Sequence, residues 1–465
     1  MKRLIPLAFL AAAAFGAEAR LSDAVAADDA QAVDKLLQSG ADAKAKDRYG
    51  FTALYFACEQ GNPAIVKRLL DAGADPNASG PSGETALMTA ARVGNMEVLR
   101  LLLDRGAAVN ATDAAAHTTA LMWAVRANHP EVVRLLLDKG AELDTKTRIG
   151  QTPTRRPPNA GGGSHGLGIV RGGWPDRGSQ DATPGAMTAL LYAARDGRSE
   201  IVQMLAKANV NQAEANGVTP LLMAITNNHL DIAKVLLDRG ANVNAMDWWG
   251  RTPLWATVDV RNIELDYKTQ EQATDRAASL ELIKTLLDRG ANVNAQTKEV
   301  VPLRRWIMPI SDLSWVDFTG QTPFLRAALS GDITVMRMLI DKGADPNIVT
   351  GSKTTALMAA AGINYAVNQT YTESDESLLA AVKLCLEKGA DVNAVNTMGF
   401  TALTGAVNRG SDDIVQLLVS KGARLDVKDK EGRDLMTWAN GVFLATTPPV
   451  PKPSTIALLK RLTAQ

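Results

Sequence analysis

The chain has 465 residues, of which 46% are hydrophobic, 22% charged and 5% aromatic, a composition typical of a folded protein. Its 50 lysines and arginines balance 50 aspartates and glutamates, so the formal net charge is zero. A neutral chain has no net field to hold a polyphosphate, which argues against nucleic acid as the main partner. The two cysteines, Cys58 and Cys385, each lie in a helical apolar pattern, and we expect buried thiols without a disulfide between them.

The first nineteen residues have the features of a secretion signal. Lys2 and Arg3 form a short positive start, residues 4–15 form an apolar stretch, and Ala17-Glu18-Ala19 places small residues at a cleavage site. The apolar stretch is shorter than the roughly 20 residues that a membrane-spanning helix needs. The sequence therefore predicts a periplasmic or secreted protein that has lost residues 1–19 and retains no membrane span.

From residue 20 onward the sequence repeats a unit of about 33 residues. An amphipathic helical stretch in each unit ends at a glycine, which can adopt the left-handed conformation that stops a helix. These glycines are Gly40, Gly73, Gly106, Gly140, Gly240, Gly290, Gly343, Gly389 and Gly422. Asp104, Asp138, Asp238 and Asp288 recur near them, which indicates a structural role.

A second signal, Thr followed by Pro or Ala and then an apolar residue, starts each unit. Threonine is a good helix N-cap, and proline at the first helical position loses no hydrogen bond. The sequence therefore predicts a repeated turn, helix, short turn and helix. The starting threonines are Thr52, Thr85, Thr119, Thr188, Thr219, Thr252, Thr322, Thr355 and Thr401.

This unit, with its Thr-(Pro/Ala)-Leu start and Gly-Ala-Asp-x-Asn end, resembles the ankyrin repeat. The resemblance covers nearly all of residues 20–465 and implies an all-α repeat solenoid of about 10–11 helix-turn-helix units joined by hairpin turns. The family's histidine after Thr-Pro-Leu is absent, and other residues, mostly apolar, take its place. Residues 205–210 lack the Gly-Ala step. Because each unit buries its apolar face only against its neighbours, we expect one elongated core.

Five irregular segments interrupt the period and define the predicted domain map. The Gly/Pro/Arg-rich segment is either a mobile linker or a partner-binding loop, and the apolar Trp-containing segment is expected to fold back on the solenoid. The map places a signal peptide at 1–19, repeats at 20–147, the Gly/Pro/Arg-rich insertion at 148–185, repeats at 186–297 with an insertion at 260–277, the apolar insertion at 298–318, repeats at 319–429 with an insertion at 363–377, and a capping repeat with a Pro-rich spacer at 430–465.

Known catalytic motifs are missing from the sequence. Of its four histidines, His129 and His229 occupy the same place in two repeats, which indicates a helix-turn position and not a ligand pair. No Gly-x-Ser-x-Gly elbow is present, and the triple glycine at 161–163 is not followed by Gly-Lys-Ser/Thr. We therefore expect no enzyme activity, no cofactor and no metal.

The resemblance implies a protein partner, bound on the concave surface that hairpin tips and first helices form. Tryptophan is enriched in binding hot spots, and its unusual positions here predict where that partner binds. The alternative is that the insertions cover these rings. We expect a non-catalytic scaffold of the bacterial cell envelope, or else a hydrolase or glycan-binding protein with a site formed by the insertions. The predicted partner-binding residues are Trp248, Trp249, Trp255, Trp174, Trp306 and Trp315.

Overall fold

The computed structural model describes residues 21–149, 185–262, 275–299, 319–363, 374–442 and 449–464. Residues 1–19 and most of the predicted insertions lie outside these ranges. The described residues form two compact units, the first made of residues 21–149 and 185–215 and the second of those from 216 onward. The sequence predicts one elongated core, but the contacts divide the chain into two units. The division falls just after residues 205–210, the repeat end that lacks the Gly-Ala step.

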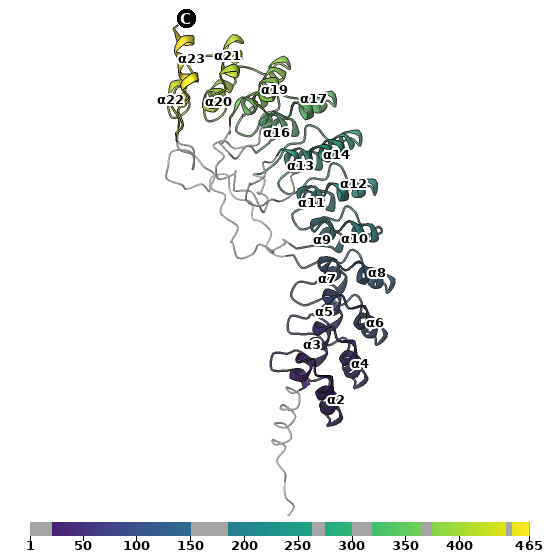
Figure 1. Cartoon of the computed structure of the whole chain (residues 1–465). Coiled ribbons are helices and arrows are strands. Elements are labelled where there is room, and N and C mark those ends of the chain that lie inside the picture. Colours follow the sequence, from purple (N-terminus) through teal and green to yellow (C-terminus); the bar gives the residue numbers. More distant parts are fainter. Residues whose placement is uncertain are drawn as a thin grey trace, which may run out of the picture. The chain divides into compact units, whose positions relative to one another are not determined.

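In the first unit, each repeat packs an inner helix against an outer one (Figure 1). Consecutive inner helices contact each other, and so do consecutive outer helices. The inner row is α3 (Ala53–Gln60), α5 (Ala86–Val93), α7 (Ala120–Ala127) and α9 (Ala189–Arg195). The outer row is α2 (Ala30–Gln38), α4 (Pro63–Asp71), α6 (Met96–Asp104), α8 (Pro130–Asp138) and α10 (Ser199–Met204).

The second unit continues the same pattern of paired helices. Its inner row is α11 (Pro220–Thr226), α13 (Pro253–Arg261), α16 (Pro323–Ser330), α18 (Ala356–Ala361), α20 (Ala402–Arg409) and α22 (Leu435–Ala439). Its outer row is α12 (Leu230–Asp238), α14 (Arg276–Asp288), α17 (Ile333–Asp341), α19 (Asp375–Glu387), α21 (Asp412–Ser420) and α23 (Pro453–Thr463). Helices α13 and α14 include the two ends of the predicted insertion 260–277, and α19 includes the last three residues of the predicted insertion 363–377.

Both sequence signals of the repeat have the predicted structural role. Each of the nine starting threonines is the N-cap of an inner helix and accepts a hydrogen bond from the backbone N–H three residues later. Each of the nine glycines that follow an outer helix has φ between 82° and 89°. Glycine enters this left-handed region without a Cβ penalty, so the chain can leave the outer helix there and start the next hairpin.

The asparagine of the Gly-Ala-Asp-x-Asn end links one repeat to the next. Asn77 Nδ2 donates to the carbonyl of Gly106 at 3.0 Å, while Asn77 Oδ1 accepts from the N–H of Ala108 at 2.7 Å. One side-chain amide thus satisfies two backbone groups of the neighbouring turn. The same pair of bonds is made by Asn110, Asn244, Asn294 and Asn393.

Three of the four recurring aspartates pair with basic residues of the next repeat, as expected of structural groups. Their partners lie at the end of the following outer helix, and the pairs are Asp104–Lys139, Asp238–Arg289 and Asp288–Lys342. All these side chains are exposed, so each bridge stabilises the protein only weakly.

Two insertions start from closed hairpins. Thr147 exchanges backbone hydrogen bonds with Ala186 and Met187, so residues 150–184 leave from the tip of a hairpin whose base is intact. Thr297 is bonded in the same way to Gly320 and Gln321 on either side of 300–318. The repeat that follows can therefore dock on its neighbour despite the added residues.

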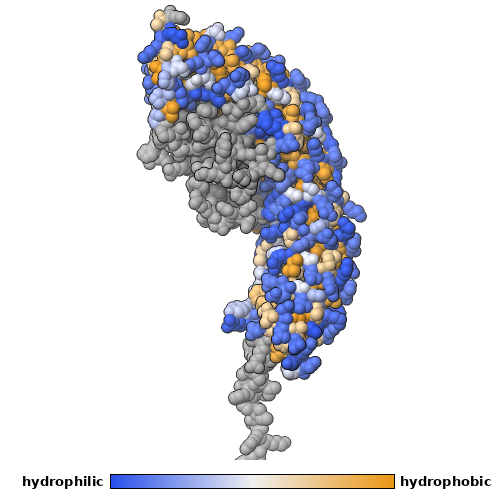
Figure 2. Space-filling view, in the orientation of Figure 1, coloured by the Kyte–Doolittle hydropathy of each residue, from blue (hydrophilic) through white to orange (hydrophobic). Residues whose placement is uncertain are grey.

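The face of both units that Figure 2 shows is largely polar. On the face shown in Figure 2, hydrophilic residues cover most of the described surface and hydrophobic residues form small patches between them. Among the helices that the structure describes, none has the length and apolarity needed to cross a membrane.

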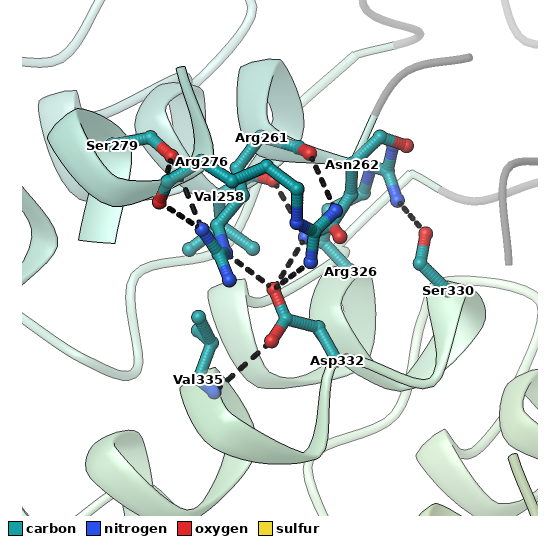
Figure 3. Close-up of polar contacts among 9 residues, drawn as sticks. All are labelled: Val258, Arg261, Asn262, Arg276, Ser279, Arg326, Ser330, Asp332 and Val335. Carbon is teal, nitrogen blue, oxygen red and sulfur yellow. Dashed lines mark hydrogen bonds and ion pairs between the residues drawn. The ribbon is translucent and has the colours of Figure 1, made fainter. Parts of the chain in front are cut away.

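A buried carboxylate joins two repeats of the second unit (Figure 3). Asp332, the N-cap of α17, is fully buried. Its Oδ2 accepts from Arg261 Nε at 2.8 Å and from Asn262 Nδ2 at 3.2 Å, and its Oδ1 accepts from the N–H of Val335 at 3.2 Å. Charge and hydrogen-bonding capacity are therefore both matched inside the protein.

Two further arginines complete this cluster. The guanidinium of Arg276, the first residue of α14, lies 4.0 Å from Asp332 Oδ2. Arg326 of α16 donates to Asp259 Oδ1 at 2.6 Å and to the carbonyl of Asn262 at 2.9 Å. The residues on either side of 263–274 are thus tied to the next repeat.

We predict that Asp332→Asn destabilises the protein by about 3 kcal/mol, because Arg261 stays buried without its counterion. The control is Asp288→Asn, which removes an exposed bridge to Lys342 and should cost less than about 1 kcal/mol. Urea unfolding of both variants checks this. Equal, small effects would show that the Asp332 cluster contributes little.

We also predict that both thiols are unreactive in the folded protein. Cys58 of the first unit and Cys385 of the second are free and buried. Burial raises the pKa of both thiols, that of Cys385 to about 12, so neither forms the nucleophilic thiolate near neutral pH. Iodoacetamide at pH 8 should label neither cysteine in the native protein and both in denaturant. Native labelling, or a Cys58–Cys385 disulfide in a non-reducing mass spectrum, would contradict this assignment.

Candidate functional site

A groove of about 290 Å³ lies in the first unit between the inner helices α3, α5 and α7 and the hairpins that precede α5 and α7. Aromatic, charged and small side chains share its walls. The helices contribute Tyr55, Met88, Thr89, Arg92, Trp123 and Arg126, and the hairpins contribute Ser82, Glu84, Asp113, Ala115, Ala116 and Thr118.

Trp123 is half-buried in the groove, and a chain of hydrogen bonds fixes its ring. Its Nε1 donates to Thr118 Oγ1 at 2.9 Å, and the N–H of Thr118 donates to Asp113 Oδ2 at 2.7 Å. Asp113 Oδ1 also accepts from the N–H of Ala116 at 2.6 Å. Burial alone would raise the pKa of Asp113, but the hydrogen bonds from Ala116 and Thr118 outweigh it and hold this pKa below its ordinary value. The carboxylate therefore stays charged and orders the hairpin against Trp123.

Arg126 lies between two aromatic rings. The carbon at the centre of its guanidinium is 5.7 Å from the centroid of the Trp123 ring and 5.4 Å from that of Tyr192 on α9. Arg195 lies over the same Tyr192 ring at 5.0 Å. Cation–π attraction of this kind is worth about 0.5–1 kcal/mol at an exposed site, so it orders the exposed Arg126 side chain.

The other end of the groove is also aromatic. Tyr55 contacts Phe51 and Phe56, with ring centroids 4.6 Å and 5.7 Å away. Burial first, and then the nearby charges of Glu59 and Glu84, raise the pKa of Tyr55, so its phenol stays protonated and can donate a hydrogen bond.

Trp248 and Trp249, two of the predicted partner-binding residues, lie together in the hairpin before α13. Both are half-buried, and their rings meet edge to face with centroids 5.5 Å apart. The Arg251 guanidinium lies 5.1 Å from the Trp249 ring and pairs with buried Asp247 at 2.6 Å. This hairpin tip therefore combines ordered aromatic rings with a cation.

Of the other four predicted tryptophans, the structure describes only Trp255. Trp255 is only 4% exposed, and its Nε1 has no hydrogen-bond partner within the described part of the chain. Trp174, Trp306 and Trp315 lie outside the described residues. Partner binding by these six tryptophans stays a prediction.

Sequence reasoning did not single out the groove, although a signal was present. Thr89, Trp123 and Tyr192 take the fourth position of their inner helices, and three arginines take the seventh. Positions three apart share one face of a helix, so aligning the repeats by their threonines would have shown this column. The arginines are Arg92, Arg126 and Arg195.

The groove has the chemistry of a binding site. In the ranges that the structure describes, no three His, Cys, Asp or Glu side chains form a group that could hold a metal ion. His129, which sequence reasoning places at a helix turn, lies with Nε2 3.0 Å from the carbonyl of Arg92. The groove presents aromatic rings, guanidinium groups, a phenol and the half-buried carboxylate of Glu84.

Comparison with known proteins agrees with the repeat structure. A family model described as ankyrin repeats (3 copies) matches residues 21–113, 80–147, 169–247 and 324–429, together more than half of the chain. The human transient receptor potential cation channel subfamily A member 1 is 22% identical over 314 residues, 53% of this chain and 28% of its own. L-asparaginase of Dirofilaria immitis is 25% identical over 177 residues, 38% of this chain and 29% of its own.

The matches with these relatives span less than a third of the relatives' own length. Among solved structures, the ankyrin repeat domain of Bcl-3 is 26% identical with a TM-score of 0.39, covering 51% of this chain and 92% of that domain. The family match covers the repeats in both units, with the threonine caps and glycine turns described above. The chain belongs to the ankyrin-repeat family.

Proposed function

We propose that this protein is a non-catalytic scaffold of the bacterial cell envelope that binds a protein partner through the concave surface of its inner helices and hairpin tips. Ankyrin repeats support a role in protein–protein interaction. The observation that carries the proposal is the groove in the first unit, where the half-buried rings of Tyr55 and Trp123 lie beside two arginines.

The residue types of the groove suit a protein partner. Trp, Tyr and Arg are the residues most enriched among those that dominate the energy of protein interfaces. The hydrogen bonds from Trp123 to Thr118 and from Thr118 to Asp113 hold the ring before a partner arrives. Less side-chain entropy is then lost on binding, which favours affinity.

The same contacts favour binding over catalysis. Asp113 is the buried carboxylate of the groove, and its oxygens are taken up by the hairpin N–H groups and the Thr118 hydroxyl. A general base needs a free lone pair within reach of a substrate proton. Asp113 therefore acts as a support for Trp123 and not as a reacting group.

We predict that Trp123→Ala weakens binding of the partner by about 2 kcal/mol, roughly thirtyfold. The partner is captured from periplasmic extract on the full chain and identified by mass spectrometry, and its affinity is measured by calorimetry. Trp248→Ala/Trp249→Ala tests the hairpin tip of the second unit in the same assay, and Arg100→Ala on the outer helix α6 is the control.

Thermal unfolding of each variant separates lost contacts from lost structure. Wild-type affinity in both tryptophan variants would reject binding at these two aromatic sites. Equal weakening by Arg100→Ala would place the partner on the outer helices.

Export is the second testable part of the proposal. Residues 1–30 fused to an alkaline phosphatase without its own signal should give active enzyme in bacteria, because this phosphatase forms its disulfides only outside the cytoplasm. Leu10→Arg interrupts the apolar stretch and should abolish activity. An inactive wild-type fusion that accumulates as intact protein would reject export.

A further inference from the structure

We infer that the groove of the first unit recognises an acidic peptide segment, with a carboxylate on Arg126 and a neighbouring bulky apolar side chain on the rings of Tyr55 and Trp123. The inference rests on the proposed function, since it names the chemistry of the partner at that site. It starts from the column of arginines at the seventh position of α5, α7 and α9.

Arg126 differs from the other two arginines of this column. Arg92 lies 3.3 Å from the carboxylate of Glu59, and Arg195 lies 2.7 Å from that of Asp196. Arg126 has no carboxylate within ion-pair distance among the described residues. The middle guanidinium therefore has a positive charge without a counterion, while both neighbours are paired.

The position of Arg126 prepares it for a carboxylate. Its guanidinium lies over the rings of Trp123 and Tyr192, and in the described ranges its N–H groups make no hydrogen bond. A guanidinium is a planar fork that binds a carboxylate through two parallel hydrogen bonds, and stacking restricts its rotation. The Arg126 side chain is thus already ordered in the free protein, so less side-chain entropy is lost when a carboxylate binds.

The charge of the site favours a carboxylate over a phosphate. One unpaired guanidinium offers a single positive charge, whereas a phosphoryl group carries nearly two negative charges and is normally held by a cluster of arginines. Arg92 and Arg195 already share their charge with Glu59 and Asp196. Glu84 and Asp113 line the same groove, and they would repel the second charge of a phosphate.

The walls of the groove account for the apolar neighbour. Tyr55 and Trp123 are half-buried, so each leaves part of its ring open to solvent, and Met88 lies among the lining residues. Burying an apolar side chain against such rings stabilises a complex by about 25 cal/mol for each Å² removed from water. The expected sequence feature of the partner is an Asp or Glu close to a Leu, Met or aromatic residue.

The experiment selects random peptides displayed on phage against the full chain, in parallel with Trp123→Ala. Selected peptides should be enriched in an acidic residue next to a bulky apolar one. The best of them is synthesised in three forms, with the acidic residue, with its amide counterpart and with phosphoserine at that position, and affinities are measured by fluorescence anisotropy.

We expect Arg126→Gln to weaken the acidic peptide about tenfold or more and to leave the amide peptide unchanged. Arg126→Lys, which keeps the charge without the fork, should fall between. Arg134→Gln on the outer helix α8 is the matched control and should bind as the wild type does. Thermal unfolding of each variant verifies that the fold is intact.

The other outcomes overturn the inference in distinguishable ways. Selected peptides without an acidic residue, or acidic peptides indifferent to Arg126→Gln, reject the carboxylate but keep the groove if Trp123→Ala abolishes their binding. Tighter binding of the phosphoserine peptide assigns the site to phosphate. If selection on the wild-type chain enriches no peptide beyond those selected on Trp123→Ala, the groove does not bind peptides and the whole inference is rejected.

Discussion

The asparagine bridge between successive turns sets the geometry on which both units depend. Asn77, Asn110, Asn244, Asn294 and Asn393 each hold a carbonyl and an N–H of the next repeat. Apolar burial brings neighbouring helices together but is not directional, so it does not choose their offset. Two hydrogen bonds from one rigid amide are directional, so they fix the offset between neighbouring helices. A constant offset is what places the fourth and seventh positions of the inner helices in columns, and Trp123 and the two arginines of the groove occupy such columns.

The parts of this fold that could be predicted from the sequence are the local ones. A threonine cap bonds to an N–H three residues away, and a glycine turn depends on one residue's own φ, so both repeat wherever the motif repeats. The Asp332 cluster could not be found that way, because Asp332 meets Arg261 and Asn262 across about 70 residues of sequence. The groove could be predicted from the sequence only in part. Its column follows from the repeat alignment, but the pairing state of each arginine depends on neighbours such as Glu59 and Asp196.

Charged residues have different surroundings at the groove and at the Asp332 cluster. Exposed aspartate bridges are found in both units, and the charged residues of the groove in the first unit face solvent or hydrogen bond within a hairpin. In the second unit Asp332 and Arg261 are buried next to residues 263–274. A buried ion pair contributes little net stability compared with apolar packing but is costly to break, so it fixes one arrangement over others. Its place beside an insertion suits that role, because an interrupted helix pair has more ways to dock on its neighbour.

Insertions at hairpin tips leave the column of inner helices intact, and this explains how the contacts of Arg126 can extend across one. The residues at 150–184 separate α8 from α9 in sequence, yet Thr147 closes the hairpin with Ala186 and Met187, and α9 packs directly on α7. Arg126 can then contact Trp123 within its own helix and Tyr192 beyond the insertion. If the added residues had entered the base of the hairpin, α9 would no longer keep its offset from α7. Tyr192 would then no longer contact the Arg126 guanidinium. The base of the hairpin, and not the length of the insertion, therefore determines whether Tyr192 reaches Arg126.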